Sequence, residues 1–266
     1  MTKVISVLNQ KGGVGKTTTA VNLAACLAAS EIRTLLIDMD AQGNTTSGVG
    51  LAKDGVSLSI YDVLSAKEGS SRTIFDAVVP SVHFECLDVI AASSDLAGVD
   101  LEWANKISRE RILSTHIEKL RELNKKEQYD FVIIDSPPAL STVVINILTA
   151  SDSVLIPIQC EYYALEGLTE LLNTIRTVQK NLNKNLKIEG VLLTMYDARL
   201  NLSRQVAEEV KSFLADKVFE IEIPRNVKLS EAPSYGKPII KYDIDSTGAK
   251  AYIDLARKII ENGGAR

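Results

Sequence analysis

The sequence predicts an α/β fold, with one mostly parallel, twisted sheet that carries helices on both faces. Short apolar, β-branched runs alternate along the chain with longer helical stretches. A glycine-rich loop joins the first of these runs to a helix within residues 4–29. The chain has 266 residues, 45% of them hydrophobic, and no linker-like segment. We therefore expect a single domain over residues 1–266.

The expected elements follow from these patterns in chain order. Short β-branched runs predict strands at Val4–Leu8, Thr34–Ile37, Leu87–Ala91, Phe131–Ile134, Val154–Ile158, Ile188–Leu193 and Val218–Ile221. Longer stretches predict helices at Lys16–Ala29, Ile107–Leu123, Thr142–Thr149, Leu165–Asn181, Ser203–Ala215 and Lys250–Glu261. Residues 42–80 are richer in Gly, Ser and Thr and less periodic, so we interpret them as loops and short helices.

The composition narrows the class of protein. A net charge of −4 gives no overall nucleic-acid signal, so a DNA-binding surface would have to be local. Cys26, Cys86 and Cys160 are far apart and form no C-x-x-C pair, which indicates buried thiols in a reducing cytoplasm. The N-terminus is typical of a strand rather than a signal peptide, and no apolar run approaches the ~18 residues that span a bilayer. We therefore expect a cytoplasmic protein.

Residues 10–18, QKGGVGKTT, match the phosphate-binding loop G-x-x-x-x-G-K-[ST] except at the first position, which is Gln10. Three glycines let backbone N–H groups wrap around phosphate oxygens. Lys16 is placed to neutralise the β- and γ-phosphates, and Thr17 to bring its hydroxyl to Mg²⁺. The flanking strand and helix are the context that such a loop requires. The sequence therefore predicts a P-loop NTPase fold that binds ATP or ADP with Mg²⁺.

Lys11 is a second cation at the entrance of the same loop. It cannot fold back onto its own phosphates while the loop keeps this shape, but it can reach a nucleotide held by a facing copy. This residue extends the prediction from ATP binding to a homodimer bridged by ATP.

Two carboxylates follow the second predicted strand, in the segment LLIDMDAQ. Asp38 and Asp40 are two residues apart, so on an extended chain they point the same way. The carboxyl edge of an open α/β sheet is where ligands bind. One carboxylate could touch the Mg²⁺ shell while the other orients the attacking water. Ordinary aspartates that satisfy a turn are the alternative, and the neighbouring phosphate loop favours the functional interpretation.

The segment FVIIDSPP is an apolar strand that ends in Asp135, followed by two prolines that stiffen the chain. This is the Walker B arrangement, in which the carboxylate holds Mg²⁺, usually through water. Alone the pattern is weak because many buried strands end in Asp. As the third element beside the loop and the two aspartates, it supports a nucleotide site.

Together, the segments KGGVGKTTT, LLIDMDAQGN, IIDSPPAL, IPIQCEYYALEG and IPRNVKLSEAPSYGKPI resemble the ParA/Soj family of deviant Walker A ATPases. These ATPases act in bacterial chromosome and plasmid partition, within the wider MinD/ParA superfamily. The resemblance runs from about Lys3 to the C-terminal helix. It departs from the family at Ala41, where proline is common, which loosens the local turn without removing a reacting group.

The resemblance implies roles for the matching residues. Lys11 would cross the dimer interface to the partner's phosphates, Thr18 would contact the α-phosphate, and Asp40 would position the hydrolytic water. The implied catalytic residues are Lys11, Lys16 and Asp40. The implied ATP-binding residues are Lys11, Gly12, Gly13, Val14, Gly15, Lys16, Thr17 and Thr18, with Pro224 and Asn226 at the purine. The implied Mg²⁺ residues are Thr17, Asp40 and Asp135.

The same resemblance implies sequence-nonspecific binding of double-stranded DNA by the ATP-bound dimer. Its matching basic positions are Arg199, Arg225, Lys228 and, less closely, Lys241. Such contacts would act by phosphate neutralisation and counterion release. Residues 199–250 hold nine Lys/Arg and eight Asp/Glu, so the charges alone equally fit a solvated, mixed-charge surface.

The resulting prediction is an ATP-dependent DNA-partitioning switch with slow intrinsic hydrolysis, stimulated by a ParB-type partner and located in the cytoplasm on the nucleoid. A MinD-like membrane ATPase that positions cell division is the main alternative, although the ending ENGGAR lacks a basic membrane helix. An iron–sulfur carrier would need paired cysteines. A nonenzymatic nucleotide-binding scaffold would not need Asp40. The C-terminal helix is amphipathic, and we expect it to pack against the sheet.

Overall fold

The computed structural model describes residues 2–52, 55–67, 70–124, 127–161 and 164–263. Its strands are β1 Lys3–Val7, β2 Thr34–Asp38, β3 Val78–Pro80, β4 Leu87–Ile90, β5 Phe131–Asp135, β6 Ser153–Gln159, β7 Lys187–Tyr196 and β8 Val218–Pro224. Its α-helices are α1 Lys16–Ala29, α2 Asn44–Gly48, α3 Ile60–Leu64, α4 Val99–Glu102, α5 Ile112–Arg121, α6 Thr142–Ala150, α7 Ala164–Asn181, α8 Asn201–Leu214, α9 Val227–Glu231, α10 Ile239–Tyr242 and α11 Thr247–Gly263. Short 3₁₀ turns lie at Ile74–Ala77 (η2), Ser94–Gly98 (η3), Arg109–Arg111 (η4), Ala215–Lys217 (η5) and Ala232–Tyr235 (η6).

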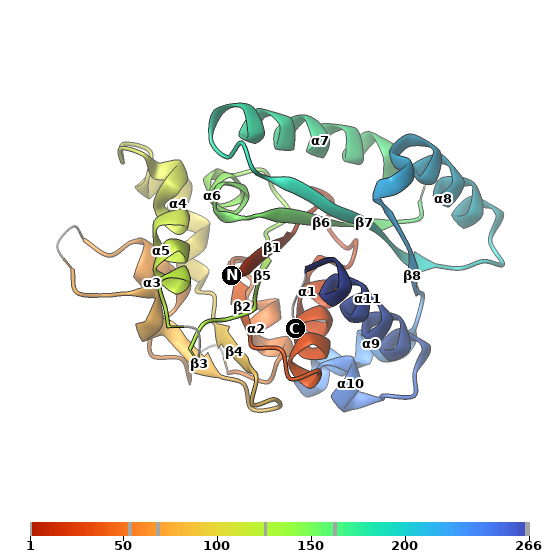
Figure 1. The fold of residues 1–266 in the computed structure, drawn as a ribbon, viewed down its shortest axis with the longest axis horizontal. Coiled ribbons are helices and arrows are strands. Elements are labelled where there is room, and N and C mark those ends of the chain that lie inside the picture. Colours follow the sequence, from red (N-terminus) through yellow and green to blue (C-terminus); the bar gives the residue numbers. More distant parts are fainter. Residues whose placement is uncertain (1, 53–54, 68–69, 125–126, 162–163, 264–266) are drawn as a thin grey trace.

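The strands form one eight-stranded sheet in the order β3-β4-β2-β5-β1-β6-β7-β8 (Figure 1). Every pairing is parallel except β3 with β4. The carboxyl ends of β1, β2 and β5 therefore meet at one edge, with Asp38 directly opposite Asp135 in the register of β2 and β5. This edge is where an open parallel sheet binds ligands.

Side chains alternate between the two faces of the sheet, as the period of a strand requires. On β5, Phe131 and Ile133 join a cluster with α1 and α11, whereas Val132 and Ile134 join one with α3, α5 and α6. A third cluster packs β6 and β7 under α6, α7 and α8. Figure 1 shows α7 and α8 on one side of β6 and β7 and α11 on the other. The predicted helices on both faces are confirmed.

Two sequence-based assignments need correction. Residues 42–80 contain a strand, β3, as well as the expected short helices. It is a three-residue antiparallel edge strand ending in Pro80, too short for a hydrophobic period to mark it. The helix expected over Ile107–Leu123 begins only at Ile112, because Ser108 adopts φ 55° in the left-handed region and interrupts it.

The first strand and the last helix meet at the edge where the strands begin. A Cβ atom on Gly263 would lie 2.9 Å from Cζ of Phe131 and 3.7 Å from Cδ of Lys3. The two ends of the described chain are therefore neighbours on the side of the sheet opposite to the ligand edge.

Candidate nucleotide site

The phosphate loop connects β1 to α1 with a backbone that depends on glycine. Gly13 and Gly15 have φ values of 75° and 88°, a region that side chains rarely adopt. Gly15 caps α1, whose first turn has no side-chain cap and no acidic residue. The first N–H groups of this helix are therefore available to an anion, and the helix dipole favours a negative charge there.

Lys16 is held inside the loop. The residue is only 7% exposed, and its Nζ donates a hydrogen bond of 2.9 Å to the carbonyl oxygen of Lys11. Burial lowers the pKa of Lys16, and the charges of Asp135 and Asp40 partly offset that effect. The ammonium group is thus held by a carbonyl of its own loop, and a phosphate oxygen can replace that carbonyl as its partner.

Asp135 is fully buried and anchors two hydroxyl groups. Oδ2 accepts hydrogen bonds from Oγ1 of Thr17 at 2.8 Å and from Oγ1 of Thr45 at 2.6 Å. Burial raises the pKa of Asp135, and the charge of nearby Asp38 raises it further. A hydroxyl and a carboxylate are the hard oxygen ligands that Mg²⁺ prefers, and a cation would relieve the cost of burying this charge. The residues present therefore fit a magnesium ion.

Thr45, at the start of α2, was missed by the sequence analysis. It lies 90 residues from Asp135 in the chain, and no motif marks it. Its hydroxyl donates to the same oxygen of Asp135 as Thr17, which is the kind of contact that an outer-shell partner makes at a metal site.

The two aspartates after β2 have different surroundings. Asp38 is buried, and Oδ2 accepts hydrogen bonds from N and Oγ1 of Thr46 at 2.8 and 2.7 Å, so it closes the loop that follows β2. Asp40 is half-buried, accepts a hydrogen bond of 3.0 Å from N of Gln42, and acts electrostatically on Lys16. Of the two, Asp40 has the freedom to meet a ligand.

Lys11 is directed to a partner outside the phosphate loop. Its Nζ lies 3.2 Å from Oε2 of Glu161, just beyond β6, and both side chains are part-exposed, at 38% and 47%. Its backbone N–H donates to Oδ1 of Asn9 at 3.0 Å, and Asn9 in turn bonds the carbonyl of Pro157. The base of the loop is therefore fixed while the Lys11 ammonium stays near the surface. Glu161 carried no sequence signal of this role.

A cavity of about 420 Å³ extends from the loop to the ends of β7 and β8. It brings together four of the predicted ATP-binding residues: Gly15, Thr18, Pro224 and Asn226. Its wall is braced by Thr194, whose Oγ1 donates a 2.8 Å hydrogen bond to the carbonyl of Val14. Mixed polar and apolar walls of this size suit a purine ring beside the phosphates. Arg225, expected at DNA, lines the same cavity.

The other predicted DNA-contacting residues lie on exposed turns and short helices. Arg199 is 88% exposed and forms an ion pair of 2.7 Å with Asp197, which holds the pKa of that carboxyl low. Lys228 on α9 pairs with Glu231 at 3.1 Å. Lys241 on the neighbouring α10 lies 4.8 Å from the ring centre of Phe84.

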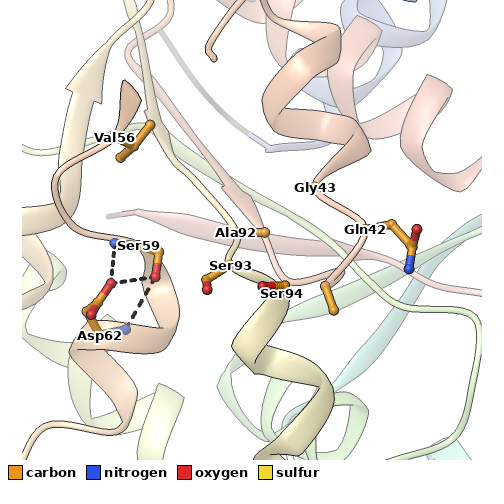
Figure 2. Close-up of a pocket in the computed structure, with 9 residues that line it drawn as sticks. Gln42, Gly43, Val56, Ser59, Asp62, Ala92, Ser93 and Ser94 are labelled. Carbon is orange, nitrogen blue, oxygen red and sulfur yellow. Dashed lines mark hydrogen bonds between the residues drawn. The ribbon is translucent and has the colours of Figure 1, made fainter. Parts of the chain in front are cut away.

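A second cavity of about 470 Å³ lies beside the loop that follows Asp40 (Figure 2). Gln42 and Gly43 form one wall, Ser93 and Ser94 another, and Figure 2 shows the capping hydrogen bonds of α3 at its far side. The cavity is polar, and three of its lining residues, Ala41, Gln42 and Gly43, directly follow Asp40 in the chain. The sequence analysis did not anticipate it.

The cysteines and the C-terminal helix occupy structural positions. Cys26 and Cys160 are buried in different hydrophobic clusters. The apolar face of α11 packs on α1 and β8, as predicted. Among the described residues, no helix is long and apolar enough to cross a membrane. Tyr162 and Tyr163, within one of the motif segments, and residues 264–266 of the C-terminal ending lie outside the described residues.

Comparison with known proteins agrees with this geometry. The AAA domain family matches residues 2–188. The sporulation initiation inhibitor protein Soj of Bacillus subtilis (strain 168) is 55% identical over 263 residues, which cover 99% of this chain and 100% of that protein. The chromosome-partitioning ATPase Soj of Treponema pallidum (strain Nichols) is 46% identical over 266 residues, covering 100% of both.

Solved structures show the same fold. Cobyrinic acid a,c-diamide synthase from Mycobacterium smegmatis, with bound ATP analog and magnesium, superposes with a TM-score of 0.81 at 32% identity, covering 100% of this chain and 96% of that one. The septum site-determining protein MinD from Pyrococcus horikoshii, complexed with Mg-ADP, gives a TM-score of 0.76 at 25% identity, covering 99% and 98%.

The sheet order, the phosphate loop and the carboxylates at its edge define a P-loop nucleotide-binding protein with a deviant Walker A motif. The identity of 55% and 46% to the two Soj proteins, over nearly the whole chain, then defines the family. The chain belongs to the ParA/Soj family of chromosome-partitioning ATPases.

Proposed function

We propose that this protein, as a single domain over residues 1–266, is an ATP-dependent switch of chromosome partition. ATP and Mg²⁺ bind at the carboxyl edge of the sheet, and two copies close face to face around their nucleotides. The dimer binds duplex DNA without sequence preference, and hydrolysis returns it to the monomer. The relatives named for chromosome partitioning, and the neighbours that hold Mg-ADP or an ATP analog, support this proposal.

The observation that carries the proposal is the division of labour between two lysines. Lys16 is buried within its own loop, whereas Lys11 is part-exposed and pairs only with Glu161 among the described residues. An exposed ion pair of this kind is worth little and is easily exchanged. Lys11 is therefore free to leave Glu161 for the more highly charged phosphates of a facing copy.

Hydrolysis would use the groups at the ends of β2 and β5. Thr17 and Asp135 would hold Mg²⁺, which supplies charge neutralisation at the β- and γ-phosphates. Asp40 would also lie at the metal and orient the attacking water. A part-exposed carboxylate on a loop is a poorly fixed base, which fits slow turnover in the absence of a partner.

We further propose that a ParB-type protein stimulates hydrolysis through a basic peptide, and that the ATP-bound form is cytoplasmic and sits on the nucleoid. The polar cavity lined by Ala41, Gln42 and Gly43 supports a stimulated state, because a peptide bound there could fix the loop that carries Asp40. Arg199, Arg225, Lys228 and Lys241 are proposed to contact DNA phosphates.

The test is retention on duplex DNA with no nucleotide, with ADP-Mg or with ATP-Mg, alongside light scattering for the dimer. Of the three conditions, we expect only ATP-Mg to give both the dimer and retention on DNA. Lys11→Ala should still bind nucleotide but lose both, by about tenfold or more. Lys211→Ala is the matched control, because this part-exposed lysine also forms an ion pair, 2.9 Å from Glu222.

Retention on DNA that ignores nucleotide, or an undiminished dimer in Lys11→Ala, would overturn the switch. A liposome sedimentation assay distinguishes the proposed DNA-binding switch from the MinD-like membrane ATPase. The apolar face of α11 is already buried against α1 and β8, so we expect no ATP-dependent sedimentation with vesicles.

A further inference from the structure

The buried side chain of Asn22 joins the start of α1 to α10. Asn22 lies in the second turn of α1 and is only 5% exposed. Its Nδ2 donates a hydrogen bond of 2.8 Å to the carbonyl oxygen of Thr18, and its Oδ1 accepts one of 2.7 Å from the backbone N–H of Ile239. Both partners are backbone groups, one an acceptor and the other a donor. The amide group therefore satisfies both in only one orientation.

This bridge supplies a hydrogen bond that α10 cannot make by itself. The first N–H groups of a helix have no partner within the helix. Helix α10 begins at Ile239 and has Pro238 as its N-cap, which has no side-chain oxygen that could accept. Ile239 is fully buried, so leaving its N–H unpaired would be costly. The start of α10 is therefore held in place by a residue of α1.

The two ends of the bridge face different proposed sites. Thr18 lies in the first turn of α1, is proposed to contact the α-phosphate, and lines the cavity of about 420 Å³. Helix α10 carries Lys241, one of the cations proposed to contact DNA. The same helix ends at Tyr242, whose hydroxyl donates a hydrogen bond of 3.0 Å to Glu231, the carboxylate that pairs with Lys228. Asn22 thus stands between the nucleotide site and two of the proposed DNA contacts.

A second contact fixes the same segment to the ligand edge of the sheet. Gly236, just before α10, and Gly50, just after α2, have φ values of 60° and 87° and pack against each other. A Cβ atom on Gly236 would lie 2.8 Å from Cα of Gly50, so no larger residue fits there. Helix α2 begins at the ligand edge, where its Thr45 bonds Asp135. The segment that leads into α10 is therefore positioned by both helices that start beside the nucleotide.

A nucleotide would act on the start of α1 directly. The first turn of this helix has no side-chain cap, so its N–H groups gain partners when phosphates bind. A ligand that binds only the closed turn makes its opening rarer. Because Thr18 and Ile239 share one amide group, a firmer first turn also holds the start of α10 more firmly.

We propose that Asn22 is a positioning residue that makes the placement of α10, and so of Lys241, depend on the occupancy of the nucleotide site. The inference rests on the proposed function, since it describes how ATP acts on the DNA surface within one protomer. The competing explanation is that ATP only brings two weak DNA surfaces together in the dimer. In that case no contact inside the protomer would matter for the response to nucleotide.

The first test is Asn22→Leu, which keeps the volume and deletes both hydrogen bonds. We expect ATP-dependent retention on duplex DNA to weaken about fivefold, while nucleotide affinity and the amount of dimer stay close to those of the wild type. Asn146→Leu on α6 is the matched control, and it should leave retention unaltered. Asn146 is also fully buried and bonds backbone groups of Leu113, Arg109 and Thr142.

The second test needs no variant. Amide hydrogen exchange of the wild-type protein is compared without nucleotide and with ADP-Mg, which avoids the ATP-bound dimer. Exchange at Ile239 should slow about threefold or more when ADP-Mg binds. The N–H of Leu113 is the internal control, because it is also bonded to an asparagine Oδ1, that of Asn146 at 3.1 Å. Its exchange should not change.

Four results would overturn the inference: full retention in a folded Asn22→Leu variant, an equal loss in Asn146→Leu, an equal change of exchange at the two amides, or no change at Ile239. A loss of dimer or of nucleotide affinity as large as the loss of retention would also overturn it, because Asn22 would then act on the nucleotide site itself. Wild-type retention that ignores nucleotide would instead contradict the proposed function. The two proposals therefore fail on different measurements.

Discussion

The nucleotide edge and the proposed DNA surface both depend on charged side chains, but they hold them in opposite ways. At the nucleotide edge, Lys16 is 7% exposed and Asp135 is fully buried, and each has defined partners. On the DNA surface, Arg199 is 88% exposed, and it and Lys228 are paired with carboxylates close in sequence. Water screens the second set and not the first.

This difference teaches where single residues carry large effects. At the nucleotide edge, Lys16 and Asp135 are buried and fixed, and the roles proposed for them and for Asp40 have no substitute, so the removal of any one of these groups is felt in full. On the surface, each cation adds one weak phosphate contact to several, and its intramolecular carboxylate already competes for it. The contrast can be tested by three experiments of decreasing expected effect.

The largest effect is expected for Asp40→Ala. Removing a group that orients the attacking water should lower the turnover number for ATP by about 100-fold or more, while nucleotide binding stays close to that of the wild type. Phosphate release and nucleotide affinity measure the two parts separately. Asp254→Ala, which removes an exposed carboxylate on α11, is the control. Unchanged phosphate release would remove Asp40 from the catalytic role.

An intermediate effect is expected for Thr45→Val. This substitution keeps the volume but deletes the 2.6 Å hydrogen bond to Asp135. Loss of an outer-shell partner should raise the Mg²⁺ concentration needed for half-maximal turnover by about tenfold. Thr149→Val, which removes a hydroxyl that bonds only its own helix, is the matched control. A magnesium dependence identical to that of the wild type would show that Thr45 does not position the carboxylate for the metal.

The smallest effects are expected on the DNA surface. Arg199→Ala and Lys228→Ala should each weaken ATP-dependent retention on duplex DNA by about two- to fivefold. Each should also reduce the slope of log affinity against log salt by about 1. Asp197→Asn and Glu231→Gln should act in the opposite direction, because they release the same cations. A loss as large as that of Lys11→Ala from either alanine variant would break the comparison between the two regions.

The nucleotide site could be predicted from the sequence because its motifs are short, continuous segments of the chain. The phosphate loop and the aspartates that end β2 and β5 lie in short segments whose strand, turn and helix patterns are visible in the chain. Helix α1 was predicted with the bounds that the structure has. Because the strands are parallel, their carboxyl ends meet at one edge, so the sequence also predicts that these segments lie together.

The rest depended on contacts that no local pattern encodes. Thr45 and Glu161 acquire their partners only because distant segments fold together. The edge strand β3 is too short to show a period, and the turn at Ser108 left Ile107 in solvent where a helix was expected.

The closeness of Lys3 and Gly263, at the edge where the strands begin, has a practical consequence for studying the protein. A short linker between these positions would make the chain circular, and new ends could be cut into an exposed turn such as that around Lys184. The segments at the opposite edge of the sheet, where the nucleotide is proposed to bind, would then keep their scaffold. A tag joined to either end of the chain would likewise start from the rear of the molecule, clear of the face that two copies would bring together.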